Sequence, residues 1–89
     1  MIRPVFTFDA EANGYVSEPF TIQQQAIVHI ELASLAPVLT LKQENDGEYA
    51  VYGQTPDESD RYKINLTTSD EAIVKIATPV DVLKCYVLN

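Results

Sequence analysis

Apolar and polar residues alternate with a period of two along most of this chain. In the clearest case, 26–32, aliphatic residues at alternate positions would share one face while His29 and Glu31 share the other. This alternation is typical of a strand with one buried face. No segment shows the 3.6-residue period of a helix. The pattern therefore predicts an all-β protein.

Other short alternating segments are separated by turn residues. We expect the remaining strands at 5–8, 15–17, 20–22, 38–43, 49–53, 62–67, 72–78 and 80–88. Seven or eight short strands, with turn signals roughly 8 to 12 residues apart, favour one small antiparallel β-sandwich over 1–89, immunoglobulin-like or jelly-roll-like. With one Cys and no Trp, the chain lacks the framework of an antibody-type domain.

Two turns predict hairpins. Asn45-Asp46-Gly47 is a hairpin signature, and the strand before it should point Leu39 and Leu41 inward. The polar turn at 68–71 should join the strands on either side of it into a second hairpin. Both expectations concern neighbours in sequence, which are often neighbours in a sheet.

The C-terminal segment 80–88 is apolar on both faces in its second half, which predicts a strand buried on both sides. Cys85 lies in this segment and is the only cysteine, so the chain forms no internal disulfide and no cysteine-based metal site. We expect Cys85 to be a small buried hydrophobe.

Acidic residues outnumber basic residues by 13 to 6, which gives a net charge of −7. Such a charge repels nucleic acids and anionic membranes. Residues 61–89 are the exception, with four basic residues against three acidic ones. The imbalance serves solubility or favours a basic partner or a basic patch on a neighbouring copy. The N-terminus lacks the pattern of a signal peptide, and no apolar run is long enough to span a bilayer.

No catalytic motif or cofactor motif is present, and we expect no enzyme activity and no cofactor. His29 is the only histidine, and most carboxylates cluster in turns where water would solvate them. The polar loop 54–60 offers a weak metal candidate through Asp57, Glu58 and Asp60, although it lacks the spacing of a calcium-binding loop. A solvated loop is the other interpretation.

Five tyrosines raise the possibility of sugar or protein recognition. Tyr49 and Tyr52 should lie on opposite faces of one strand, and an exposed Tyr52 beside Tyr62 would form a stacking platform. A small glycan-binding β-sandwich is therefore an alternative function. The absence of Trp favours packing in the core or against a neighbour.

The chain as a whole resembles small virion proteins of tailed bacteriophages that decorate or cement capsids. The resemblance lies in the opening strand 5–8, the turn at Asn13-Gly14, the restart at Ser17-Glu18-Pro19-Phe20, and compact strands running to the last residue. It implies a non-enzymatic structural protein, made in the host cytoplasm and located in the virion. Its partners would be other virion proteins or copies of itself.

An exposed strand edge at 5–8 and the apolar final strand are the expected contact surfaces. The interface candidates are Val5, Phe6, Phe8, Tyr52, Tyr62, Tyr86 and Leu88.

Overall fold

Strand β4 (Ala26–Leu32) is the centre of a three-stranded antiparallel sheet in the computed structural model, which describes residues 1–44, 47–67 and 71–89. β7 (Arg61–Leu66) pairs along one edge of β4, and β9 (Val82–Leu88) pairs along the other. Buried and half-buried residues alternate strictly along β4, as the sequence pattern predicts.

The second sheet has six strands in the order β1-β2-β8-β5-β6, with β3 also paired to β8. All of its pairs are antiparallel. Its strands are β1 (Phe6–Asp9), β2 (Gly14–Ser17), β3 (Phe20–Thr21), β5 (Leu39–Gln43), β6 (Tyr49–Gln54) and β8 (Glu71–Ile76).

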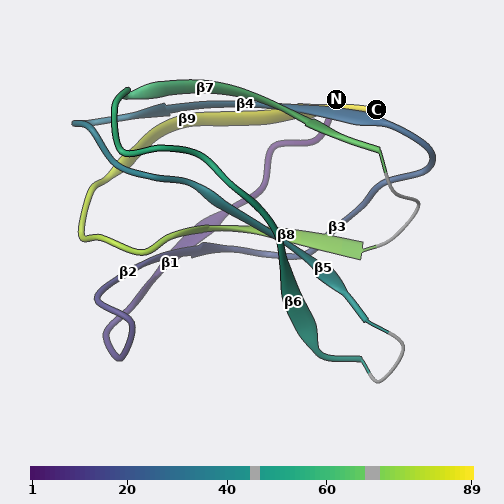
Figure 1. Ribbon diagram of the computed structural model, residues 1–89, viewed down its shortest axis with the longest axis horizontal. Helices are drawn as coiled ribbons and strands as arrows, with labels where there is room; N and C mark the ends of the chain where they lie inside the picture. Colours follow the sequence, from purple (N-terminus) through teal and green to yellow (C-terminus); the bar gives the residue numbers. More distant parts are fainter. Residues whose placement is uncertain (45–46, 68–70) are drawn as a thin grey trace.

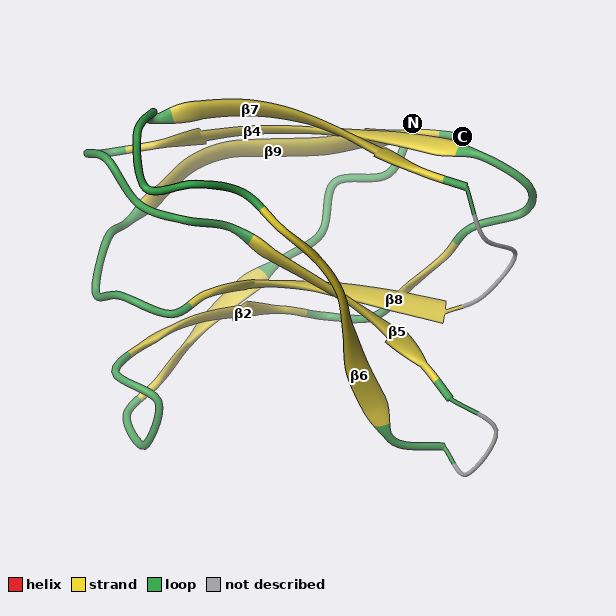
Figure 2. Cartoon of the chain, viewed as in Figure 1, coloured by secondary structure: helices red, strands yellow, loops and turns green. Residues whose placement is uncertain are grey.

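The two sheets form two layers, with β7, β4 and β9 together in one layer and β1, β2 and β8 in the other (Figure 1). The apolar core of the β-sandwich is drawn from both sheets and includes Val28, Leu66, Val74, Ile76 and Val87. Figure 2 shows only strands, loops and turns over the described residues. No helix in this part of the chain is long and apolar enough to cross a membrane.

The two N-terminal strands form a hairpin whose turn matches the expected position. Asn13 adopts the left-handed conformation, with φ of 52°, directly before β2. Asn tolerates this conformation better than most residues with a side chain. The predicted hairpin of β5 and β6 is also present, with Gly47 at φ of 86°. The other two residues of its turn signature, Asn45 and Asp46, lie outside the described residues.

The prediction that Leu39 and Leu41 point inward is wrong. Both leucines are half-buried, and the fully buried residues are their neighbours Val38 and Thr40. Thr40 pairs with the buried Val74 of β8, and its hydroxyl lies 3.4 Å from the carbonyl oxygen of Gly53. A threonine can occupy a core position when its hydroxyl makes a hydrogen bond. A prediction from hydropathy alone therefore placed the wrong face of this strand in the core.

The second predicted hairpin is also wrong. β7 pairs with β4, whereas β8 pairs with β2, β3 and β5 in the other sheet. β7 and β8 therefore lie in different layers. Alternation identifies both strands, but it carries no information about which sheet each of them joins.

β9 is not buried on both sides, which corrects the prediction for the C-terminal segment. It is an edge strand whose inner face carries the buried Cys85 and Val87, while Leu83 and Leu88 are exposed. A β-bulge interrupts the pairing with β4 between Glu31 and Leu32, at the level of Leu83. Leu83 is the extra residue of this bulge. It breaks the alternation of inward and outward side chains, so its apolar side chain faces solvent.

Candidate interaction surface

The side of the three-stranded sheet that faces away from the core carries three cross-strand rows. We call these nine residues the outer face. The rows are Arg61–Glu31–Lys84, Lys63–His29–Tyr86 and Asn65–Ile27–Leu88, each running from β7 through β4 to β9. Residues at alternate strand positions point to the same side, so the register of β4 with its two neighbours fixes this arrangement.

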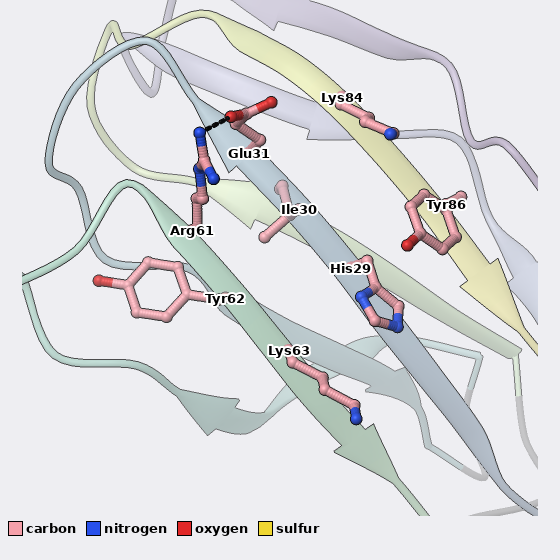
Figure 3. Close-up of a pocket in the computed structure, with 8 residues that line it drawn as sticks. All are labelled: His29, Ile30, Glu31, Arg61, Tyr62, Lys63, Lys84 and Tyr86. Atoms are coloured by element: carbon pink, nitrogen blue, oxygen red, sulfur yellow. Dashed lines mark ion pairs between the residues drawn. The ribbon is translucent and has the colours of Figure 1, made fainter.

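An aromatic pair lies in the middle row. The rings of His29 and Tyr86 are stacked, with centroids 4.6 Å apart and planes within 8° of parallel. The ammonium group of Lys84 lies 5.5 Å from the centroid of the Tyr86 ring, a distance typical of a cation–π contact. In Figure 3 these side chains project from neighbouring strands around a shallow open depression of about 380 Å³.

Positive charge is concentrated on the outer face. It holds three of the six basic residues of the chain, Arg61, Lys63 and Lys84, but only one of the 13 acidic residues, Glu31. Arg61 and Glu31 form an ion pair of 2.8 Å, drawn as a dashed line in Figure 3. Lys63 and Lys84 form no ion pair with a carboxylate in the described part of the chain. A basic patch therefore stands on a strongly acidic protein.

Tyr86 and Leu88 are the two interface candidates that lie on the outer face. Tyr62 does not join them, because it is directed away from His29 and Tyr86 in Figure 3. The Tyr62 hydroxyl donates a hydrogen bond to the carbonyl oxygen of Pro56 and accepts one of 3.2 Å from the backbone N–H of Ser59. Tyr62 thus anchors the loop that precedes β7.

Tyr52 and Tyr62 do not form the expected stacking platform. The ring pairs among the described residues are Phe8–Tyr15 and His29–Tyr86. Tyr52 instead lies within 3.1 Å of the Thr67 hydroxyl, and this hydrogen bond lowers the pKa of the Tyr52 hydroxyl.

Neither Tyr49 nor Tyr52 is a core residue. Tyr52 occupies a β-bulge of β6, where both it and Val51 are exposed. Tyr49 is half-buried and donates a 2.6 Å hydrogen bond to Glu71, which raises the pKa of Tyr49 to about 12. The bulge breaks the strict alternation from which opposite faces were expected.

The remaining interface candidates lie at the edge formed by β1. Val5 is exposed and precedes the strand, which begins at Phe6. Phe6 is half-buried against the core. Phe8 is exposed, and its ring packs edge-to-face against the ring of Tyr15, with the two centroids 5.3 Å apart. This edge belongs to the larger sheet, so it forms a surface separate from the outer face.

Asp57, Glu58 and Asp60 are exposed in the loop before β7. Within the described residues, no three His, Cys, Asp or Glu side chains come together as a metal site would require. The loop therefore contributes carboxylates to the surface without an arranged cation site in this part of the chain.

Sequence reasoning found His29 and Tyr86 separately but missed the outer face as a unit. Lys63 and Lys84 contribute to the basic excess of residues 61–89, but the sequence does not single them out, because each is an ordinary polar position within its own strand. Only the pairing of β4 with β7 and β9 brings them into rows with His29 and Tyr86. The available signal in the sequence was spacing. Arg61 and Lys63 are two positions apart, as are Lys84 and Tyr86, so each pair shares one side of its strand.

Comparisons with known proteins add no relative. No family model matches the chain, and neither a curated protein nor a solved structure matches it. Any functional argument therefore depends on the surface itself.

Proposed function

We propose that this chain is a non-enzymatic interaction module of a larger protein assembly and that it docks through the outer face. The observation that carries this proposal is the middle row of that face, in which the stacked rings of His29 and Tyr86 lie directly beside Lys63. Aromatic rings on a rigid sheet expose a large contact area at a low cost in conformational entropy, and the lysines beside them add charge that attracts an acidic partner.

The shape of the outer face supports a macromolecular partner. Its depression is open and spread over three strands, whereas sites for small ligands are usually enclosed clefts that cover most of the ligand. The exposed Leu83 and Leu88 of β9 add apolar area in and beside the same surface. A partner would cover these side chains as well as the rings.

The narrower role that we propose is an accessory protein of a phage virion, for decoration or cementing of the capsid. Its support is the whole-chain resemblance described above, together with the small β-sandwich fold. A domain of 89 residues has little core, so association with a larger shell would add buried area to a modest intrinsic stability.

The test is the mass of the purified chain in solution, measured by sedimentation velocity alone and with candidate shell proteins. We expect a concentration-dependent oligomer or co-sedimentation with a larger particle, in either case weakened by Tyr86→Ala. The matched control is Tyr49→Phe, which changes a tyrosine of the other sheet. A chain that stays monomeric and ignores every shell protein would contradict the proposal.

The second candidate function is glycan binding, and the exposed aromatic pair is what favours it. Sugars stack on open ring faces, but one face of each ring here is occupied by the other ring. Titration with a panel of oligosaccharides, followed by NMR chemical shifts of the His29 and Tyr86 rings, separates the two functions. Saturable shifts with a sugar would favour the glycan module.

A further inference from the structure

A second charged surface lies beside the outer face. The loop 55–60 connects β6 to β7 and contains no apolar residue other than Pro56; we call it the acidic loop. Its carboxylates, from Asp57, Glu58 and Asp60, are exposed and form no ion pair with a described cation. In Figure 1 the segment between β6 and β7 runs to the end of the layer that holds β7, β4 and β9.

The backbone of the acidic loop is held firmly. The backbone N–H of Leu32 donates a 2.7 Å hydrogen bond to the carbonyl oxygen of Asp60, and the N–H of Ala36 donates one of 3.4 Å to Ser59. The Tyr62 hydroxyl contacts the backbone of both Pro56 and Ser59. The backbone of the loop is therefore held in place, so little backbone conformational entropy is lost when its exposed carboxylates bind a partner.

We propose that the outer face of one copy of this chain binds the acidic loop of a second copy, and that the second copy does the same in return. The result is a dimer with two-fold symmetry, and this inference rests on the docking role proposed above. Lys63 and Lys84 supply unpaired positive charge, and Asp57, Glu58 and Asp60 supply unpaired negative charge. Both halves of the complementary contact are thus present on one chain.

The position of the loop favours a closed pair. Asp60 directly precedes Arg61, which begins the first row of the outer face, so the loop and the face are adjacent on the molecule. A two-fold axis beside them brings each loop onto the other copy's lysines at once, which is the reciprocal contact of an isologous dimer. A pairing that brought lysines against lysines would be repulsive, so the charges also specify the orientation.

The net charge of −7 on each copy opposes association at long range, but only weakly at physiological salt, where the Debye length is about 8 Å. Three strands about 4.8 Å apart and about 20 Å long give a contact smaller than a standard interface of about 800 Å² per partner. We therefore expect a reversible dimer that dissociates on dilution and in high salt.

A charge-swap experiment tests this dimer. The face variant is Lys63→Glu with Lys84→Glu, and the loop variant is Asp57→Lys with Glu58→Lys. Each variant alone places like charges in both contacts and should be monomeric at concentrations where the unmodified chain dimerises. Mixed in equal amounts, the two variants have opposite charges in both contacts, so the mixture should regain the dimer. Sedimentation velocity measures all three samples.

The control for the face variant is Lys42→Glu with Lys75→Glu, which changes net charge equally but lies on the larger sheet. It should dimerise much as the unmodified chain does. Thermal unfolding followed by circular dichroism verifies that every variant is folded.

Three outcomes would overturn the inference. A dimer that survives both charge reversals forms through another surface, which leaves the interaction role intact. A mixture of the two variants that stays monomeric would show that the outer face does not bind the acidic loop of a second copy. A chain that is monomeric alone but binds a shell protein through Lys63 and Lys84 has a foreign partner on this face, which supports the proposed function and excludes the self-contact.

Discussion

The side chain of Ser17 accepts a hydrogen bond of 2.8 Å from the backbone N–H of Val74, and both residues are buried. Ser17 ends β2, whose pairing with β8 includes Val16, and β3 resumes the pairing at Phe20. The hydroxyl thus takes the place of a carbonyl acceptor at a gap in the sheet. It donates its own hydrogen to the carbonyl oxygen of Glu18 at 3.0 Å.

Ser17→Ala should lower the free energy of unfolding by about 1–3 kcal/mol, because it leaves the buried N–H of Val74 without an acceptor. Urea unfolding followed by circular dichroism measures the loss. Ser34→Ala, in the exposed connection after β4, is the control and should change stability by less than about 0.5 kcal/mol. Equal effects of the two substitutions would show that the Ser17 bond is dispensable.

Gly14→Ala should be among the most damaging single changes in the chain. A Cβ atom at Gly14 would lie 2.0 Å from the carbonyl oxygen of Ile76, which is backbone in the adjacent strand β8. Only a shift of the β2–β8 pairing could relieve this overlap, so we expect a loss of about 3 kcal/mol or more. Thermal unfolding temperatures report it.

Gly53→Ala is the matched comparison. A Cβ atom there would lie 3.2 Å from the side-chain oxygen of Thr40, which would have to shift by only a few tenths of an ångström. We expect a clearly smaller loss than for Gly14→Ala. The reverse order would mean that β2 can move relative to β8.

The strands themselves could be predicted from the sequence, because burial on one face imposes a period of two on each strand. The bounds of β4 are those that the alternation predicts. The assignment of strands to sheets could not be predicted. β7 and β8 follow each other in sequence yet lie in different layers, because long-range pairing with β4 and β5 determines their positions.

The outer face shows the same limit. His29 and Tyr86 are 57 positions apart in the sequence, and nothing in either segment indicates that their rings meet. The bulge at Leu83 is equally hidden, although it decides which apolar residues of β9 reach the surface. Local pattern therefore predicts what each strand can present, and sheet register decides what is presented together.

Cys85 should be unreactive in the folded protein. Burial raises the pKa of its thiol from 9.0 to about 11, so almost none of the reactive thiolate is present at neutral pH. We expect reaction with a thiol reagent at pH 8 to be slow in the native state and to accelerate sharply in urea. Rapid reaction of the native chain would show that β9 opens readily from the sheet edge.

The same thiol makes stability fall at alkaline pH. Because the pKa of Cys85 is higher in the folded state, its contribution is fully present below about pH 9 and is lost as pH rises through about 11. Two pKa units correspond to about 2.7 kcal/mol at most. Urea unfolding between these pH values should show this slope, and Cys85→Ala should remove the part of the slope that begins near pH 9. The titration of Tyr49, whose pKa is about 12, would remain in that variant.

The stacked rings of His29 and Tyr86 should stabilise each other. A double-mutant cycle built from His29→Ala, Tyr86→Ala and the double variant isolates their coupling, which we expect at about 0.5–1.5 kcal/mol for an aromatic pair. The control cycle replaces Tyr86 with Leu88, which occupies the neighbouring row of the outer face. That cycle should give a coupling near zero. Zero coupling in both cycles would mean that the rings do not hold each other in place. The outer face would then have to order its central row on binding, which would weaken its affinity for any partner.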